Sequence, residues 1–178
     1  MILSVIAAIS NENERSRVAD IYERYGENMY AKAYSILRND HDAEDAVMCA
    51  FERIIIHIDK FMNGDMDSLA GLVMIYTKCA AIDIYRKNKS HAADPLDEVS
   101  DMSDDTADVV ISNQTAEDIA NAMNALTDMQ KNALILKYYY GHSSEEIAEI
   151  IGSTAEAVRT MLLRARRKLA KILKEKMS

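Results

Sequence analysis

The sequence contains no tryptophan, a single proline and only five glycines among its 178 residues. Proline and glycine supply the tight turns that connect short strands, so their scarcity excludes an all-β protein with many hairpins. A chain in which 49% of the residues are hydrophobic is also not wholly disordered. Alanine, leucine, isoleucine, methionine, glutamate and lysine are abundant, and the composition predicts an all-α protein with one or two small domains.

Cysteine and catalytic motifs are equally scarce. Cys49 and Cys79 are too few and too far apart for a disulfide framework or a set of metal ligands. The sequence has no glycine-rich phosphate loop, no His-Glu-x-x-His and no nucleophile elbow, so we expect no catalytic residue, no metal and no cofactor. The histidines are scattered and are expected in loops or on helix surfaces: His41, His57, His91 and His142.

The first ten residues are apolar, but no basic segment precedes them and polar residues follow at once. Such a stretch is too short to span a bilayer and has the wrong flanks for a signal peptide. We therefore expect no membrane insertion, a cytoplasmic protein, and an N-terminal segment that packs on the core.

Charge is strongly segregated along the chain, whose net charge is −8. Residues 94–118 contain nine acidic side chains and no basic one, whereas residues 159–176 contain eight basic side chains and one acidic one. A smaller basic cluster at residues 86–89 precedes the acidic stretch. This pattern predicts two basic binding surfaces joined by an acidic connector, with ordinary solvated helix faces as the alternative.

Apolar residues recur at helical spacing in three stretches before residue 90, which predicts an N-terminal helical domain over residues 1–89. Asp42 is expected to cap the second of these helices, and Ser68 to begin the third after a loop at residues 62–67. Residues 90–114 are predicted to form a flexible acidic linker. A second helical domain is predicted over residues 115–178.

The C-terminal domain carries the strongest local pattern. Thr127 and Ser143 each open a capping box, Gly152 permits a tight turn, and Ser153 or Thr154 can cap the last helix. A short helix, a turn and a basic second helix are the plan of a helix-turn-helix unit, whose second helix enters the major groove. The alternative is a helical hairpin with a solvated basic face.

Three tyrosines at residues 138–140 precede Gly141, where the helix that begins at Thr127 is expected to stop. We expect them to pack in the core and at the helix end. The alternative is that they contact a partner protein.

Several stretches of the sequence resemble bacterial RNA polymerase sigma factors. The similarity to the fourth conserved region of that family lies in Leu126–Leu136, Ser143–Gly152 and Ala157–Leu169, and that to the second region in Asp40–Val47 with Phe51 and in Ala80–Lys87. Two domains joined by a short linker are the layout of the extracytoplasmic-function (ECF) class.

The resemblance implies a transcription initiation factor and not an enzyme. Such a protein binds bacterial core RNA polymerase, directs it to promoter DNA, assists melting, and has an anti-sigma factor as a further partner. The alternative is a stand-alone helix-turn-helix regulator that binds duplex DNA without polymerase. The acidic helix start and the basic cluster at residues 86–89 favour the sigma factor, because a stand-alone regulator needs neither.

The resemblance also places three binding surfaces on the sequence. Polymerase binding is expected at Asp42, Glu44, Asp45, Met48, Phe51 and Glu52. Contacts with the minus-ten element are expected at Lys78, Asp83, Arg86, Lys87 and Lys89. Contacts with the minus-thirty-five element are expected at Ser153, Thr154, Glu156, Arg159, Thr160, Leu163, Arg164 and Arg167.

One of these assignments has a structural alternative, and some positions depart from the family pattern. Asp83 can instead orient Arg86, which lies three residues further along the same helix. The usual Trp-Leu pair is replaced by Leu72-Val73, and the usual asparagine by Cys79. Members of the family commonly have glutamine at the position of Met48. They commonly have Gly-Thr at the positions of Glu156-Ala157 and arginine at that of Met161. These changes leave the helical pattern intact and bear on the promoter sequence and on strand opening.

Overall fold

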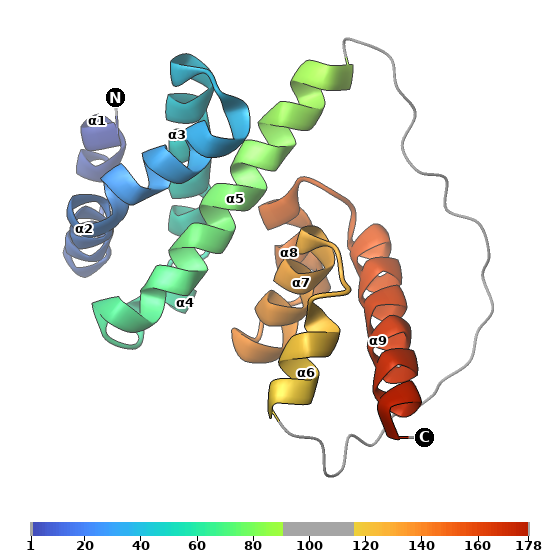
Figure 1. Ribbon diagram of the computed structural model, residues 1–178. Helices are drawn as coiled ribbons and strands as arrows, with labels where there is room; N and C mark the ends of the chain where they lie inside the picture. Colours follow the sequence, from blue (N-terminus) through green and yellow to red (C-terminus); the bar gives the residue numbers. More distant parts are fainter. Residues whose placement is uncertain (1, 91–115, 178) are drawn as a thin grey trace.

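The computed structural model describes residues 2–90 and 116–177, and these two ranges contain helices and no strand (Figure 1). The all-α prediction is therefore confirmed. The N-terminal domain comprises α1 (Ile2–Ala7), α2 (Glu12–Leu37), α3 (Asp40–Ile56), α4 (Asp59–Met62) and α5 (Met66–Ser90). The C-terminal domain comprises α6 (Ala116–Met123), α7 (Asp128–Leu134), the π-helix η1 (Ile135–Tyr139), α8 (Ser144–Ile151) and α9 (Ala155–Met177). The predicted acidic linker lies, apart from Ser90, outside the described residues.

Two helix starts in the N-terminal domain differ from the prediction. Asn39, in an extended conformation, caps α3 because its side chain accepts a hydrogen bond from the Asp42 backbone N–H at 2.9 Å. Asp42 therefore lies inside the first turn, and its prediction as the cap was wrong. Asp65 accepts the backbone N–H of Ser68 at 2.8 Å in the same way, and α5 begins at Met66, two residues earlier than expected.

The core of the N-terminal domain lies between α2, α3 and α5, which all pack against one another. Each helix contributes fully buried side chains to it, among them Ile21 and Met29 from α2, Phe51 from α3, and Leu72 and Tyr76 from α5. Burying an apolar side chain of this size stabilises a fold by about 1.5–3 kcal/mol. The short helix α1 docks on α2 through Ile2 and Ile6, as expected for the N-terminal segment.

Helix α5 is long and apolar enough, by length and composition alone, to cross a membrane over Met66–Lys89. Its place in the fold explains this composition. It is the central helix of the molecule, since α2, α3 and α8 all pack against it, and Leu72, Val73 and Cys79 are fully buried there.

Capping sets the helix boundaries of the C-terminal domain, as predicted. Thr127 and Ser143 each form a complete capping box, with Gln130 and Glu146 respectively. Gly152 ends α8 in the left-handed conformation, with φ of 67°. Thr154 then accepts the backbone N–H of Ala157 at 3.2 Å, which makes Thr154 the cap of α9.

The three consecutive tyrosines at the end of η1 do not share one environment. Tyr138 is 60% exposed and Tyr139 is 78% exposed, so the expectation that they pack in the core was wrong. Tyr140 alone is half-buried. Consecutive residues on a helix point in different directions, so neighbouring side chains in such a run cannot all turn inward.

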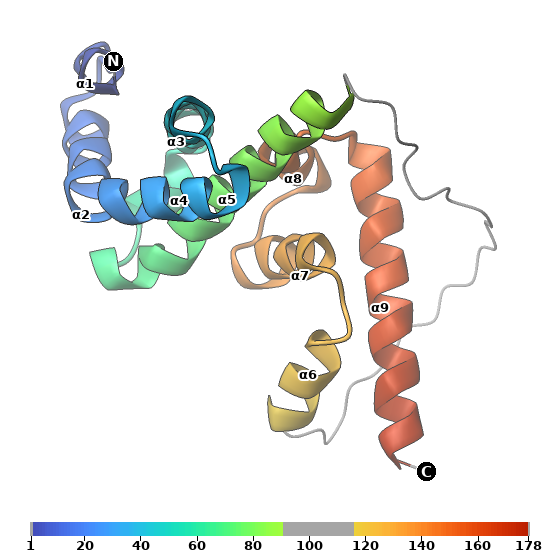
Figure 2. The same cartoon turned by 45° about the horizontal axis from the view of Figure 1, so that its top comes forward.

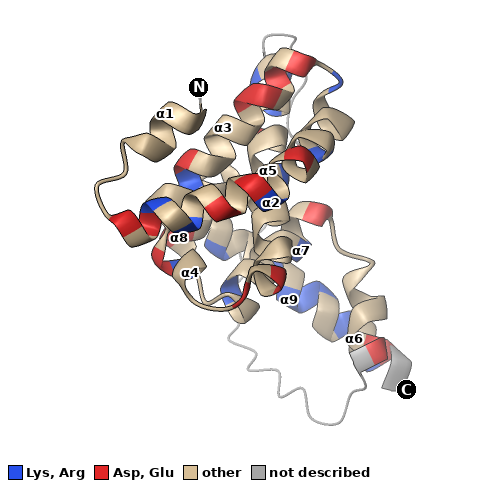
Figure 3. Cartoon of the chain, turned by 90° about the vertical axis from the view of Figure 1, so that its left-hand side faces the viewer, with Lys and Arg blue, Asp and Glu red and all other residues tan. Residues whose placement is uncertain are grey.

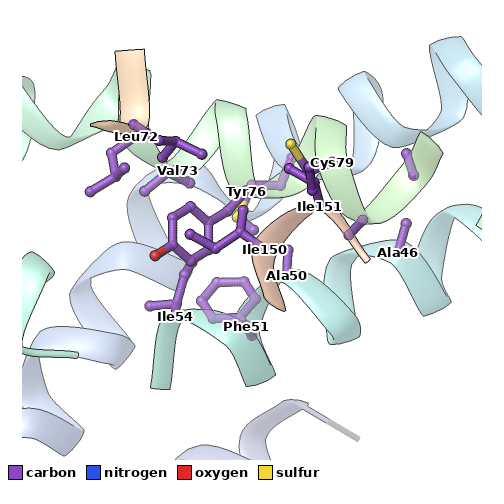
Figure 4. Close-up of a cluster of buried hydrophobic side chains, with 14 of the residues drawn as sticks. Ala46, Ala50, Phe51, Ile54, Leu72, Val73, Tyr76, Cys79, Ile150 and Ile151 are labelled. Carbon is purple, nitrogen blue, oxygen red and sulfur yellow. The ribbon is translucent and has the colours of Figure 1, made fainter. Parts of the chain in front are cut away.

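The two domains pack directly against each other. Helix α8 lies beside α5 in both cartoon views and packs against it (Figures 1 and 2). Its residues Ile150 and Ile151 lie among Ala50, Tyr76 and Cys79 of the N-terminal domain (Figure 4). A single hydrophobic core therefore runs from one domain into the other.

Candidate functional site

Helices α8 and α9 form the helix-turn-helix unit that the sequence predicted. The turn between them spans Gly152 to Thr154, and the Gly152 backbone N–H donates to the Ala148 carbonyl. Val158, Leu162 and Ala165 of α9 are buried against the rest of the domain. The opposite faces of α9 remain available to a partner.

The residues predicted to contact the minus-thirty-five element lie at the start and along the outer faces of α9. Cationic residues recur along this helix (Figure 3). Thr160, Leu163 and Arg164 are half-buried, and the exposed members of the set are Ser153, Thr154, Glu156, Arg159 and Arg167.

Arg159 already has a partner within the helix-turn-helix unit. Its guanidinium donates to the carboxylate of Glu145 in the first turn of α8, and both side chains are more than half exposed. An exposed ion pair contributes little to stability, about 0–1 kcal/mol. Arg159 can therefore exchange Glu145 for another acceptor at small cost.

The basic cluster predicted for the minus-ten element lies at the C-terminal end of α5. Arg86, Lys87 and Lys89 are exposed there. The Lys89 ammonium lies 5.1 Å from the centroid of the Tyr85 ring, and its hydrogen bond with Tyr85 raises the pKa of Lys89. Tyr85 is itself 42% exposed, so an aromatic face lies beside the three cations.

Lys78, two turns earlier on α5, is directed to the other domain. Its ammonium donates to the carboxylate of Asp128, the first residue of α7, at 2.7 Å. This hydrogen bond lowers the pKa of Asp128. In this arrangement Lys78 bridges the domains and does not belong to the exposed basic cluster.

Asp83 is buried, and its partners are not those expected. The carboxylate lies 2.9 Å from Arg53 Nη2 and 3.1 Å from Lys87 Nζ, so the proposed pairing with Arg86 was wrong. The reason is geometric, because Lys87 lies four residues on and Arg53 faces Asp83 from α3. Asp83 does not face outward, and in this arrangement it cannot contact DNA as predicted.

The residues predicted to bind polymerase lie along α3. Glu44, Asp45 and Glu52 are exposed, whereas Asp42 and Met48 are half-buried. Phe51 is fully buried and meets the ring of Tyr22 edge-on. The prediction that Phe51 contacts a partner was wrong, because its spacing places it on the apolar face that packs against α2 and α5.

A set of residues between the domains escaped the sequence analysis. Arg53 donates through Nη1 to the Ile150 carbonyl at 2.6 Å, in addition to its pair with Asp83. The sequence did indicate that these charges are buried, since Arg53 and Asp83 each interrupt an apolar stretch of their helices. It did not indicate which segment of the chain would cover these stretches.

Two histidines also lie in the seam between the domains, where α3 and α5 pack against α8 and the loop before it. Both lie between helices, as expected for loop residues, but neither is open to solvent. His57 and His142 are both buried. The Tyr76 hydroxyl lies 2.9 Å from His142 Nε2, while His142 Nδ1 lies 3.2 Å from the Leu136 carbonyl. The carbonyl can only accept, which assigns the proton to Nδ1 and makes Nε2 the acceptor of the tyrosine O–H. Burial lowers the pKa of His142 and raises that of Tyr76.

An open pocket of about 450 Å³ lies along the same seam, between α3 and α8. Its lining comprises Cys49, Glu52, Arg53, Ile56, His57 and Glu149. Within the described ranges, no group of three or more histidine, cysteine, aspartate or glutamate side chains is arranged to hold a metal ion.

Comparison with known proteins gives the class of this fold and site. Residues 21–91 match the family described as sigma-70 region 2, and residues 116–169 match the family described as sigma-70, region 4. The chain is 28% identical over 175 residues to the ECF RNA polymerase sigma factor SigW of Bacillus subtilis, covering 92% of each chain. It is 26% identical over 144 residues to the RNA polymerase sigma factor SigV of the same organism, covering 78% of this chain and 80% of SigV.

A solved structure also matches, with a TM-score of 0.36 and 21% identity over 87% of this chain and 97% of the other. It is the sigma factor RpoE in complex with the anti-sigma factor NepR from Bartonella quintana.

The two matched regions, in this order, define a sigma factor. The chain belongs to the sigma-70 family, and within that family it is an ECF sigma factor. Members of this family are non-enzymatic transcription initiation factors whose partners are core RNA polymerase and promoter DNA.

Proposed function

We propose that this sigma factor binds core RNA polymerase through α3, reads the minus-thirty-five element through α9, and engages the minus-ten element through the end of α5. The observation that carries the proposal is the pair of exposed cationic surfaces, one on each domain, in a chain that matches both sigma regions in order. Each surface has the chemistry that its role requires.

The support for duplex reading is the geometry of α9. An α-helix fits the major groove, and an arginine there can bond a guanine through two hydrogen bonds. Arg159 lies about 6 Å along the axis from Ala155, since each residue adds 1.5 Å, which is within the first turns that meet base edges. Its present acceptor, the exposed Glu145 carboxylate, is easily exchanged.

The support for a role in melting is the chemistry at the end of α5. Separated strands need cations for their phosphates and aromatic faces on which unstacked bases can lie. Arg86, Lys87 and Lys89 supply the cations, and the exposed ring of Tyr85 supplies one such face. Cys79, in place of the usual asparagine, is fully buried and does not contribute a strand contact in this arrangement.

The support for polymerase binding is the exposed acidic start of α3. Glu44 and Asp45 lie in the second turn of that helix, where they are exposed and remain open to a basic partner surface. Glu52 extends the acidic face two turns further. Core packing accounts for Phe51, so the proposed surface is more polar than the sequence suggested.

The test is co-purification with bacterial core RNA polymerase followed by run-off transcription from a cognate promoter. We expect Glu44→Lys with Asp45→Lys to weaken polymerase binding at least tenfold without unfolding, because exposed charges contribute only about 0.5 kcal/mol to stability. The matched control, Glu23→Lys with Glu27→Lys, makes the same charge change on exposed positions of α2 and should bind as the parent does.

Equal binding by both double variants would show that α3 is not the polymerase surface. Tight, sequence-specific binding of duplex DNA by the chain alone, with no effect of polymerase, would favour a stand-alone regulator. We also propose a cytoplasmic location and an anti-sigma partner, and both proposals are supported by membership of the ECF class.

A further inference from the structure

The seam between the domains is built like a specific interface. Ile150 and Ile151 of α8 are each no more than 1% exposed, and they pack where α3 and α5 meet (Figure 4). Apolar side chains buried in this way stabilise the association of the surfaces that they join. Helix α8 is therefore part of the core of both domains.

A polar cluster of Arg53, Asp83 and the Ile150 carbonyl, here called the polar joint, fixes the position of α8 on the N-terminal domain. Arg53 binds the Asp83 carboxylate at 2.9 Å and the Ile150 carbonyl at 2.6 Å, which links α3, α5 and the last turn of α8. Gly152 lies against the same carboxylate, and a Cβ added to it would be 2.6 Å from Asp83 Oδ1. Glycine is thus required here both for its left-handed φ of 67° and for the space that Asp83 occupies.

Complementary side chains surround the joint. The Tyr76 hydroxyl bonds His142 across the seam at 2.9 Å. In three further pairs the N-terminal domain supplies the basic side chain and the C-terminal domain supplies the carboxylate. These pairs are Lys78–Asp128 (2.7 Å), His57–Glu149 (3.3 Å) and Lys60–Glu146 (3.8 Å).

This arrangement conflicts with simultaneous contact to both promoter elements. The contact between Gly152 and Asp83 places the start of α9 against α5. Elements centred near minus ten and minus thirty-five are about 25 base pairs apart, which is about 85 Å of duplex at 3.4 Å per pair. The 25 residues from 91 to 115 have a covalent reach of about 80–90 Å at 3.3–3.6 Å per residue, so the chain allows the separation that the promoter demands.

We propose that the free protein rests in this closed state, in which α8 covers the face of α3 and α5 that carries Arg53 and Asp83. The chain must open along this seam before it can contact both promoter elements. The occupant of the covered face is thus the protein's own C-terminal domain. The role of opening in promoter contact rests on the proposed function, whereas the closed state is a property of the chain alone.

Small-angle X-ray scattering of the full chain tests the closed state directly. We expect the wild type to fit the closed arrangement. Ile150→Lys places a charge in the shared core, and Asp128→Lys with Glu149→Lys reverses two carboxylates that face basic groups. Each should raise the radius of gyration by several ångströms while helix content stays at the parent's level by far-ultraviolet circular dichroism.

The matched control is Asp67→Lys, which reverses a first-turn aspartate paired with Arg24 inside the N-terminal domain. It should leave the radius of gyration unchanged. The proposal is overturned if the wild type already has separated domains, if neither seam variant expands, or if the control expands as much as they do.

A reversible cross-link tests whether opening is required. Lys78→Cys and Asp128→Cys would be joined across the seam by a disulfide-containing bismaleimide in a Cys49→Ser background. Cys79 is fully buried, and burial raises the pKa of its thiol to about 11, so it should not compete for the reagent. We expect the cross-linked chain to give at least tenfold less run-off transcript than the same variant before cross-linking, with recovery after reduction.

Undiminished transcription by the cross-linked chain would overturn the requirement for opening. Failure of the wild type to support transcription with core polymerase would refute the proposed function. In that case scattering would still decide whether the chain is closed, so the two failures are distinguishable.

Discussion

The two domains form their hydrophobic cores in different ways. The N-terminal domain packs three long helices of 26, 17 and 25 residues against one another. In the C-terminal domain, α8 has only eight residues, and five of them are buried. A short helix buried over so much of its surface needs partners on two sides, and these are α9 and α5. The domain whose α9 we propose to read duplex DNA thus completes its core on the domain that we propose to engage the minus-ten element.

Substitutions at two glycines separate the cost of a left-handed backbone conformation from the cost of a steric contact with Asp83. Gly141 and Gly152 have nearly the same left-handed φ, 69° and 67°, but nothing lies within 4 Å of a Cβ added at Gly141. We expect Gly141→Ala to cost about 1–2 kcal/mol for the backbone conformation alone. Gly152→Ala should cost about 2–4 kcal/mol, because the new methyl group also meets the Asp83 carboxylate. Urea denaturation of the full chain measures both.

A second substitution isolates the steric part of that cost. Asp83→Ala by itself destabilises the chain, because it leaves Arg53 without its carboxylate partner. It should cost less in the Gly152→Ala background, where it also removes the atoms that the new methyl group meets, than in the Gly141→Ala background. Equal free energies of unfolding for the two glycine variants would show that Asp83 does not press on Gly152 in solution.

The next largest effect is expected on promoter choice and comes from the C-terminal domain. Arg159→Ala removes a side chain that can bond a guanine bidentately, a contact worth about 1–3 kcal/mol of discrimination. The variant should change which upstream sequences support transcription. Run-off transcription from a library with a randomised upstream element measures this, and a preference identical to the parent's would mean that α9 docks differently.

The sequence predicted helix boundaries best where side chains cap the helices locally. Thr127, Ser143 and Gly152 form the caps that their spacing indicated. The start of α3 was harder, because Asn39 and Asp42 are both capping residues in one short polar run. The choice between them depends on the left-handed backbone of Arg38, with φ of 54°, which local composition does not reveal.

The seam could not be predicted from the sequence for a physical reason. Arg53 and the Ile150 carbonyl are 97 residues apart, and their bond depends on how two separately predicted units pack. Spacing identified the apolar face of α8 but not that α5 would cover part of it. The same limit explains His57 and His142, whose burial comes from the packing of the two domains.

Acidification should weaken the seam through His142. Burial lowers the pKa of this ring, so the unfolded chain takes up the proton first, and stability decreases as the pH falls below about 6.5. The groups that face the ring from neighbouring elements include Tyr76, His57, Lys60 and Glu146. His142→Gln, which can still hydrogen-bond on both sides, should flatten this dependence.

Denaturation at a series of pH values from 8 to 5 measures the slope for the parent and for His142→Gln. Glu146 contributes in the same direction. Its burial, the largest single influence, favours the neutral form, but the hydrogen bond from Ser143 N–H and the nearby Lys60 and histidines together lower its pKa. That contribution is lost only at a more acidic pH. Parallel curves for parent and variant over pH 7 to 5.5 would show that His142 does not sense the pH.

The smallest effect is expected at the far end of α9. Lys171 is exposed and lies about 24 Å along the helix axis from Ala155, at 1.5 Å per residue, beyond the reach of a groove about 12 Å wide. It can meet a phosphate at most, and a phosphate contact positions the protein without reading sequence. Lys171→Ala should therefore lower transcription from all upstream sequences by one common factor of a few-fold at low salt. Because each lost phosphate contact reduces the salt slope by about 0.9, the difference from the parent should shrink as salt rises. The same randomised library, transcribed at two salt concentrations, checks this, and a loss confined to some upstream sequences would place Lys171 in the groove and shift the docking of α9 toward its C-terminal end.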